Sequence, residues 1–150
     1  LYHLNTAYDG MAYFEGIRGY EAALEDMSKS VKEVCVFGAS ELEGHRPDAW
    51  AVLMKMLKKR ALNKIPTRIL FEKELKESTT LSVDRSPLLQ QYMKARFWGD
   101  STFEGEIALY ENTVVLTSYD EKLVSLVIKN GSIATTFQSI FNTAWEDSIQ

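Results

Sequence analysis

Apolar and polar residues recur with two different periods along this chain, and these periods predict where helices and strands lie. Between residues 16 and 31, apolar side chains return every three or four positions, with glutamate and lysine between them. The apolar stripe consists of Ile17, Tyr20, Ala23, Leu24, Met27 and Val31. This spacing predicts an amphipathic helix with one face in the core.

The short apolar run "EVCVFGAS" follows and is typical of a buried β-strand. Pro47 and Asp48 then begin a second predicted helix, whose core stripe is Trp50, Leu53, Met54, Leu57 and Ala61. Cations gather near the end of this helix, where they complement the negative end of the helix dipole. They are Lys55, Lys58, Lys59, Arg60 and Lys64. We expect a solvated helix end here, with a phosphate site as the alternative.

The second half of the chain begins with "IPTRILFEKEL", which predicts another strand, and residues 76–86 are polar and predict a loop. Pro87 then starts a short predicted helix that continues through Met93 toward "ARFWGD". Three β-type runs, "TFEGEIALY", "TVVLTSY" and "KLVSLVIKN", precede a final helix with Ser132 as its expected N-cap. The predicted order is helix, strand, helix, strand, short helix, three strands and helix. It indicates an α/β sandwich around a mixed sheet.

Composition narrows the class of protein. The 150 residues are 45% apolar and 25% charged, with no apolar run long enough to cross a bilayer, so we expect one compact domain over residues 1–150. A net charge of −4 argues against nonspecific binding of nucleic acid, which needs a basic surface. The single cysteine, Cys35, lies in an apolar strand, where a buried, inert thiol is expected and no disulfide can form; this indicates the cytoplasm. The start "LYHLN" lacks an initiator methionine and a signal peptide, and indicates a piece of a longer protein.

Few residues in the chain are suited to metal or imidazole chemistry. Its two histidines, His3 and His45, have no other metal ligand at the usual spacing, so we expect no metal and no cofactor. His45 lies beside Arg46 and Asp48 and is a candidate ligand contact. The segment "FGASELEG" lacks the repeated glycines of a dinucleotide-binding turn.

Glu104 and Glu106 form a candidate pair in the first of the three β-type runs. Residues two apart in a strand share a face, with Cα atoms roughly 6.5 to 7 Å apart. Two carboxylates so placed could act as acid and base in glycoside cleavage. The alternating positions, however, are Phe103, Gly105, Ile107 and Leu109. This alternation already predicts polar residues on a solvent-exposed face, which is the reading we favour over a catalytic pair.

The order of these segments resembles a known domain. "YFEGIRGYEAALEDM", "KEVCVFGAS", "MLKKRALNKIPTRIL", "KARFWGD" and the run from "ALYENTVVLTS" to "FNTAWE" are similar to the phospholipase D-like C-terminal domain of TrmB-family transcriptional regulators. The similarity covers nearly the whole chain. It includes the aromatic-Glu-Gly start at residues 14–16, Arg60 and Arg68 in "KKRA…P.R", the tryptophan after Arg96, and the ending "I…F…FN..W". The resemblance implies a phospholipase D-like α/β sandwich.

Enzymes of the phospholipase D superfamily carry the half-site His-x-Lys-x4-Asp, in which histidine is the nucleophile and lysine binds phosphate. If the predicted hairpin turn at residues 111–112 is superimposed on the family's Asp-Gly turn, the motif falls on Glu104, Glu106 and Glu111. Thr117 and Ser118 then lie where the superfamily often has Gly-Ser. A carboxylate in place of the lysine would repel an anionic substrate, so we expect the catalytic motif to be lost.

The resemblance implies a regulatory role. In such regulators an N-terminal winged helix-turn-helix binds DNA, a helical linker pairs two subunits, and this domain senses a ligand or completes the dimer. We therefore expect a non-catalytic effector-sensing or dimerisation domain, a homodimer, an effector such as a sugar, and DNA contacts in a separate domain ahead of Leu1. The alternatives are a phosphodiesterase-type or carboxylate-based hydrolase and a stand-alone protein-interaction module using Trp98 and Trp145. We expect both tryptophans to pack in the core.

A ligand pocket is expected where the strand ends meet the loops, as in other open α/β sheets. The candidate residues are the segment 38–41, Arg68, Glu104, Glu106 and Ser118. Arg68 is also a candidate to neutralise Glu104 or Glu106 across the sheet.

Overall fold

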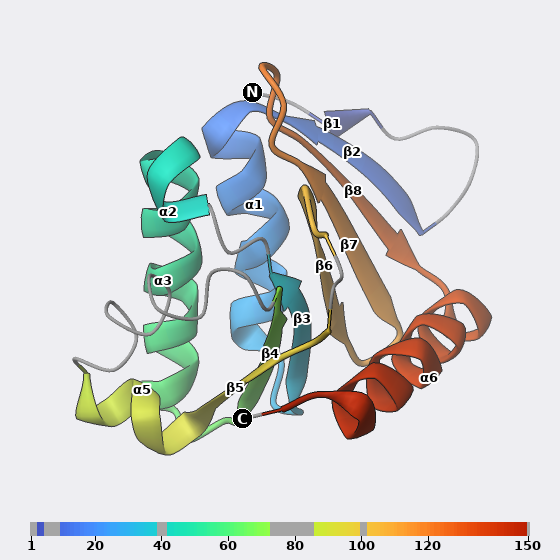
Figure 1. Cartoon of the computed structure of the whole chain (residues 1–150). Helices are drawn as coiled ribbons and strands as arrows, with labels where there is room; N and C mark the ends of the chain where they lie inside the picture. The colour runs from blue at the N-terminus through green and yellow to red at the C-terminus, as the bar shows by residue number, and fades with distance from the viewer. Residues whose placement is uncertain (1–2, 5–9, 39–41, 73–85, 100–101, 150) are drawn as a thin grey trace.

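The fold is built on one mixed sheet of eight strands in the order β1-β2-β8-β7-β6-β3-β4-β5 (Figure 1). The computed structural model describes residues 3–4, 10–38, 42–72, 86–99 and 102–149. The strands are β1 (His3–Leu4), β2 (Met11–Glu15), β3 (Val34–Gly38), β4 (Thr67–Phe71), β5 (Met93–Phe97), β6 (Gly105–Tyr110), β7 (Thr113–Ser118) and β8 (Val124–Lys129). The helices are α1 (Gly16–Lys29), α2 (Leu42–His45), α3 (Pro47–Leu62), α5 (Pro87–Tyr92) and α6 (Gly131–Asp147).

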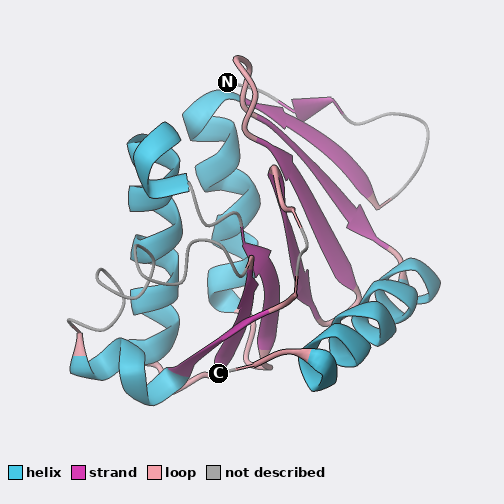
Figure 2. Ribbon diagram, in the orientation of Figure 1, coloured by secondary structure: helices cyan, strands magenta, loops and turns pink. Residues whose placement is uncertain are grey.

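The sheet joins a parallel half to an antiparallel half. Strands β3, β4 and β5 are parallel, while β6, β7, β8, β2 and β1 pair antiparallel, and β6 pairs antiparallel with β3. Helices α1 and α3 cover one face, and α6 lies on the other (Figure 2). This arrangement confirms the predicted α/β sandwich around a mixed sheet.

Two apolar cores lie on the two faces of the sheet. The core under α1 and α3 includes Tyr20, Leu24, Leu57, Ile69, Phe71 and Val115. The core under α6 includes Phe37, Leu70, Leu109, Val114, Phe141 and Trp145. Every residue of β3 is buried, because this central strand is covered on both faces.

Strands β1, β2 and β5 and the short helix α2 were not expected from the sequence. The predicted short helix ends at Tyr92, and Met93 begins β5, which pairs in parallel with β4. The helical spacing of Leu88, Leu89, Tyr92 and Met93 runs directly into the alternating positions Met93, Ala95 and Phe97, which pack on the α1–α3 core. The prediction of a helix through Met93 was wrong because pairing with β4, a long-range contact, decides the conformation there.

The cap of the last helix also differs from its prediction. Asn130 is the N-cap, and its side-chain oxygen accepts a hydrogen bond from the Ile133 backbone N–H at 3.0 Å. Ser132 lies inside the first turn. Asparagine and serine are both good N-caps, so the sequence offered two candidates two residues apart.

Lys55, Lys58, Lys59 and Lys64 are exposed, as expected for a solvated helix end, but Arg60 is not. Its side chain is fully buried, and the guanidinium donates to the backbone carbonyls of Met27, Ser30, Lys32 and Pro66 and to the Thr67 hydroxyl. Three of these carbonyls follow the last turn of α1 or belong to it, where the helix dipole is negative and favours a cation. Burial lowers the pKa of Arg60 to about 10. Arg60 therefore holds the end of α1 against α3 and the start of β4.

Two predicted segments of the chain lie outside the described residues. The predicted loop at 76–85 and the pocket residues 39–41 belong to segments that the structure does not describe. Trp145 is 6% exposed and packs in the α6 core, as predicted, whereas Trp98 is half-buried at its edge. In the described part of the chain, no helix is long and apolar enough to cross a membrane.

Candidate functional site

Glu106 is a buried carboxyl group in the middle of the sheet. It is the second residue of β6, is 2% exposed, and directs its carboxylate toward α1. The prediction of a solvent-exposed pair is thus correct for Glu104, which is exposed, and wrong for Glu106. The prediction from alternating polar and apolar positions was wrong for Glu106 because β6 lies inside the sheet. Helices lie over both faces of the sheet there, so neither side of β6 faces solvent.

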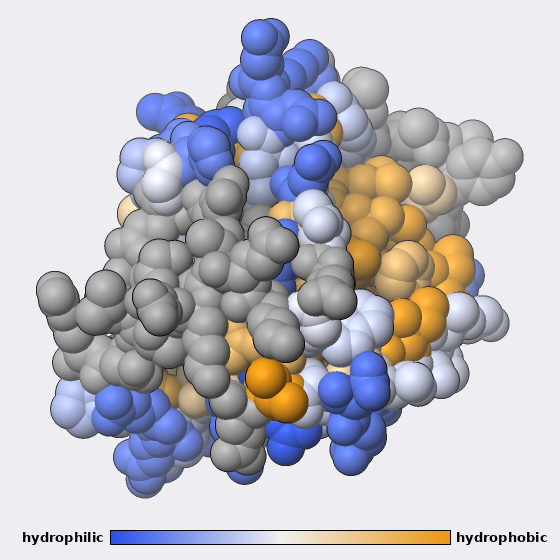
Figure 3. Space-filling model, viewed as in Figure 1, coloured by the Kyte–Doolittle hydropathy of each residue, from blue (hydrophilic) through white to orange (hydrophobic). Residues whose placement is uncertain are grey.

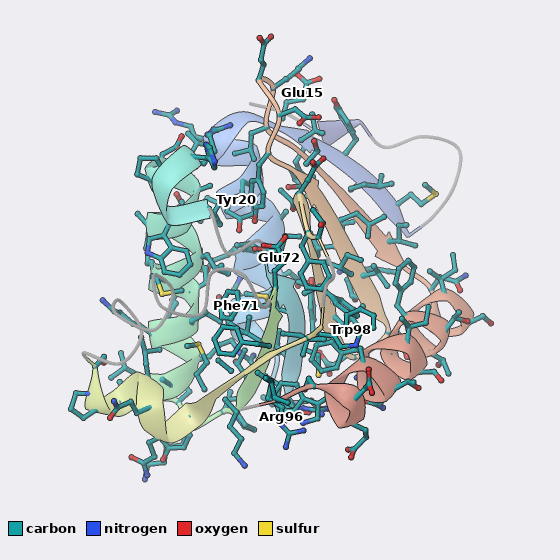
Figure 4. The ribbon with its side chains drawn as sticks, viewed as in Figure 1. Glu15, Tyr20, Phe71, Glu72, Arg96 and Trp98 are labelled. Atoms are coloured by element: carbon teal, nitrogen blue, oxygen red, sulfur yellow. The ribbon has the colours of Figure 1, made fainter. Side chains whose placement is uncertain are left out.

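Two tyrosines hold the Glu106 carboxyl group. The Tyr119 hydroxyl donates to Oε2 at 2.6 Å. Tyr20 reaches from α1 (Figure 4), and its hydroxyl lies 3.1 and 3.2 Å from the two carboxyl oxygens of Glu106. The two tyrosine oxygens are 3.3 Å apart, and their rings meet edge to face. Next to Glu106 in the sheet register lies Thr117, whose hydroxyl is 2.9 Å from that of Ser125. We call Glu106, Tyr20 and Tyr119 the buried acid cluster.

Burial dominates the electrostatics of this cluster. It raises the pKa of Glu106 to about 7, although the hydrogen bonds from Tyr119 and Tyr20 favour the carboxylate and limit the rise. Burial, together with the nearby Glu106 charge, raises the pKa of both tyrosines well above the ordinary value. The cluster can hold or release a proton near neutral pH, but it offers no cation to an anionic ligand.

An apolar groove lies on the opposite face of the sheet, beside α6. Its volume is about 710 Å³, and its apolar lining includes Tyr13, Phe103, Ile107, Leu116, Leu126 and Phe137. The polar residues of the lining are Thr102, Glu104, Glu106, Thr117, Ser118 and Ser125. Glu106 belongs to this lining although its carboxylate points to the α1 face. Apolar residues gather over this region in the space-filling view (Figure 3). The volume and the apolar lining fall in the range of known ligand pockets.

Of the four candidate ligand-binding residues, Glu104, Glu106 and Ser118 line this groove and Arg68 does not. Ser118 is the last residue of β7 and stands opposite Gly105 in the register. Its hydroxyl donates to Asp120 Oδ2 at 3.2 Å. Arg46 forms a two-pronged salt bridge with Asp48 and also donates weakly, at 3.5 Å, to the Asp120 carbonyl.

Arg68 is placed away from the other candidate residues. It lies near the start of β4, in register with Cys35, and its guanidinium pairs with Glu33 at 2.9 Å. It also stacks over the rings of Phe141 and Trp145, 5.2 and 5.1 Å from their centroids. These contacts place Arg68 on the α6 face, whereas the Glu106 carboxyl lies on the α1 face. The idea that Arg68 neutralises Glu106 is therefore wrong.

Cys35 is buried next to Arg68. Burial raises the pKa of its thiol, and its sulfur lies 3.4 Å from Arg68 Nη2 and 3.5 Å from Gln138 Nε2. This agrees with the expectation of a buried thiol, and a raised pKa disfavours a reactive thiolate.

Sequence reasoning missed three residues near the site. Tyr20 was assigned to an apolar helix stripe, and Tyr119 was not considered. A tyrosine hydroxyl in a core needs a hydrogen-bonding partner, and this requirement could have indicated a buried polar group near Tyr20. Glu72, at the end of β4, is also buried, and its carboxylate accepts a hydrogen bond from the Phe103 backbone N–H (Figure 4). Glu72 thereby ties the segment before β6 to the carboxyl end of β4.

Metal binding finds no support in the described ranges of the chain. They contain no group of three or more histidine, cysteine, aspartate or glutamate side chains that could hold a metal ion.

Comparison with solved structures identifies the fold as phospholipase D-like. NucT from Helicobacter pylori has a TM-score of 0.66 at 15% identity, over 93% of this chain and 97% of that chain. Nuc from Salmonella typhimurium, a phospholipase D family member, has a TM-score of 0.65 at 12% identity, over 92% of this chain and 95% of that chain.

A third similar structure is TrmBL2, an archaeal chromatin protein whose structure shows a novel mode of DNA binding. Its TM-score is 0.62 at 16% identity, over 97% of this chain. The present chain spans only 56% of TrmBL2. No family model and no curated protein sequence matches the chain. The TM-scores of these structures establish the fold. Sequence identities this low do not establish the function, which has to be argued from the site.

Proposed function

We propose that this chain is a non-catalytic regulatory domain of a TrmB-like transcriptional regulator, in which it senses an effector or pairs two subunits. The observation that carries the proposal is the buried acid cluster at the hairpin where a related enzyme would keep its phosphate-binding lysine. Strands β6 and β7 contain no histidine, lysine or arginine. A buried, proton-holding Glu106 supplies neither the nucleophile nor the cation that phosphodiester cleavage of this type requires.

The same geometry disfavours a carboxylate-based hydrolase. A catalytic pair must reach one substrate from both sides, with both carboxyl groups facing the cleaved bond. Glu106 is 2% exposed and its oxygens are engaged by Tyr20 and Tyr119, whereas Glu104 is exposed beside the groove. The two groups therefore occupy different environments, which supports a role without turnover.

The first experiment tests for catalysis. The purified chain is assayed with bis(p-nitrophenyl) phosphate and with p-nitrophenyl glycosides, beside the double variant Glu104→Gln and Glu106→Gln. We expect no turnover above background for either protein. Turnover by the wild type that the double variant loses would reject the proposal in favour of a hydrolase.

A second experiment tests sensing. Sugars, nucleotides and anions are screened for stabilisation of the chain against heat, because a ligand that binds only the folded state raises its stability. We expect a hit whose effect is lost in Glu104→Gln or Ser118→Ala and kept in Glu121→Gln. Glu121 is an exposed carboxylate in the β7–β8 connection, outside the groove lining. A compound that stabilises all three variants as much as it stabilises the wild type would contradict sensing at the groove.

A further inference from the structure

A polar pocket lies near the end of α6, away from the groove. Its volume is about 440 Å³, and its charged lining residues are Glu33, Arg68, Lys94 and Arg96. The described residues that line this pocket are all different from those that line the groove. We call it the basic pocket, because its described lining carries three cations against one carboxylate in a chain whose net charge is −4.

The sheet register brings the three cations together. Arg68 in β4 stands opposite Lys94 in β5, and Arg96 is two residues further along β5, so all three lie on the same face of the sheet. That is the α6 face, since the alternate residues Met93 and Phe97 pack in the core under α1 and α3. Neighbouring strands are only about 5 Å apart, so the sheet holds these cations close to one another.

Trp145 orders two of the cations. Arg96 lies between β5 and the end of α6 (Figure 4), and its guanidinium is 4.5 Å from the centroid of the Trp145 ring. It also donates to the Trp145 carbonyl at 2.9 Å. The Arg68 guanidinium lies over the same ring, 5.1 Å from its centroid. Two like charges near one ring repel each other, and a bound anion offsets this repulsion. Because both guanidiniums are already ordered, such binding costs little side-chain entropy.

Two of the cations keep donors for a ligand. Arg68 pairs with Glu33 at 2.9 Å, whereas Lys94 and Arg96 have no carboxylate partner within the described part of the chain. Lys94 is exposed, and Arg96 is half-buried and uses one guanidinium nitrogen on the Trp145 carbonyl. The N–H groups of a guanidinium form a planar fork that suits carboxylate and phosphate oxygens. The unused donors of Lys94 and Arg96 are therefore available to an anion.

We propose that the basic pocket binds a small dianion, either a phosphate monoester or a dicarboxylate. The excess of cations over carboxylates in the lining matches the charge of such a ligand, and the volume of about 440 Å³ is in the range of small-molecule sites. Gln91, an exposed residue of the lining, adds an amide that can bind the rest of the ligand. The rest of the chain is more negative than the whole, which disfavours a long polyanion such as nucleic acid. This site is separate from the groove, so the inference goes beyond the proposed function.

Calorimetric titration of the 150-residue chain with glycerol phosphate and with succinate tests the inference and tells the two ligand classes apart. Sodium chloride at equal ionic strength is the reference. We expect one of the two dianions to bind, with a dissociation constant raised roughly 10-fold or more in Lys94→Gln and in Arg96→Gln, because each variant loses a hydrogen bond to a charged group. Lys94→Gln changes an exposed side chain and keeps the test valid if Arg96→Gln does not fold.

Two further variants complete the design. Lys58→Gln is the matched control, because it removes an exposed cation of α3 on the other side of the sheet and should bind the dianion as the wild type does. Glu33→Gln should bind the dianion more tightly than the wild type, because it removes the one carboxylate of the described pocket lining.

Two results would overturn the inference. One is a wild-type chain that binds neither dianion at concentrations up to about 10 mM, including the case in which it binds a single-stranded oligonucleotide instead. The other is binding that Lys94→Gln leaves unchanged while circular dichroism shows the variant to be folded. A dianion held at the basic pocket should stabilise Glu104→Gln as fully as the wild type, so such a compound is set aside when sensing at the groove is judged. Failure of the basic pocket is therefore distinguishable from failure of the proposed function.

Discussion

At the scale of the residue, Glu106 has an environment opposite to the one that a catalytic or anion-binding group needs. It is buried, it accepts hydrogen bonds from two tyrosines, and its pKa is raised to about 7. Removing a carboxyl group from water disfavours its charged form, and the tyrosines offset only part of that cost. Glu106 should therefore contribute to the pH dependence of the protein's stability.

The pH dependence has a definite sign. Below the ordinary pKa of 4.5, the folded and unfolded chains both hold the Glu106 proton. Between 4.5 and about 7 only the folded chain holds it, so the free energy of unfolding falls as the pH rises. Above pH 7 the loss is complete and amounts to about 3 kcal/mol.

Glu106→Gln removes the titrating group and should abolish this fall between pH 5 and pH 8 in urea unfolding experiments. Glu104→Gln, which changes an exposed carboxylate two residues away, should keep the wild-type pH dependence. Equal slopes in the wild type and Glu106→Gln would show that the carboxyl is not held protonated by burial.

Arg60 is the second residue whose role depends on burial. Its guanidinium has no carboxylate partner among the hydrogen bonds described, and backbone carbonyls and one hydroxyl accept its protons. Arg60→Met should destabilise the fold by about 3 kcal/mol, because it leaves several buried acceptors unsatisfied.

The neighbouring Lys59 provides the control for Arg60. Lys59→Met also replaces a cation by an unbranched apolar side chain, but it removes only an exposed ion pair with Glu25 and should have a much smaller effect. Chemical denaturation of both variants at one pH measures the difference. Similar losses in the two variants would contradict the structural role of Arg60.

At the scale of the element, the β6–β7 hairpin positions the site. The two strands pair from Gly105–Ser118 to Tyr110–Thr113, with a two-residue turn in which Glu111 has a φ of 49°. The predicted hairpin is therefore confirmed, together with its turn at residues 111–112. At its open end the β7 backbone approaches Gly105 so closely that an added Cβ would lie 2.6 Å from the Thr117 carbonyl oxygen.

Gly105→Ala should push the two strands apart at this end and destabilise the fold by roughly 1 to 3 kcal/mol. Gly44→Ala in α2 is the comparison, because an added Cβ there meets nothing within 4 Å, and alanine favours a helix. We expect Gly44→Ala to be neutral or slightly stabilising in thermal unfolding. A Gly105→Ala protein as stable as the wild type would show that the hairpin has room to adjust.

At the scale of the whole molecule, the two faces of the sheet differ. Helices α1 and α3 close one face over a continuous core that contains the buried acid cluster. The single helix α6 closes only part of the other face and leaves the groove beside it. The sheet thus has one covered face and one face that is partly open at the groove.

The sequence by itself determined the main helices, the central strands and the α/β class, because their hydrophobic periods are local and regular. It could not determine β5 or the burial of Glu106 and Arg60. Pairing with β4 overrides the helical spacing at Met93, and helices from distant parts of the chain enclose the two charged side chains. Burial is a property of the assembled layers, and only the tertiary structure decides it.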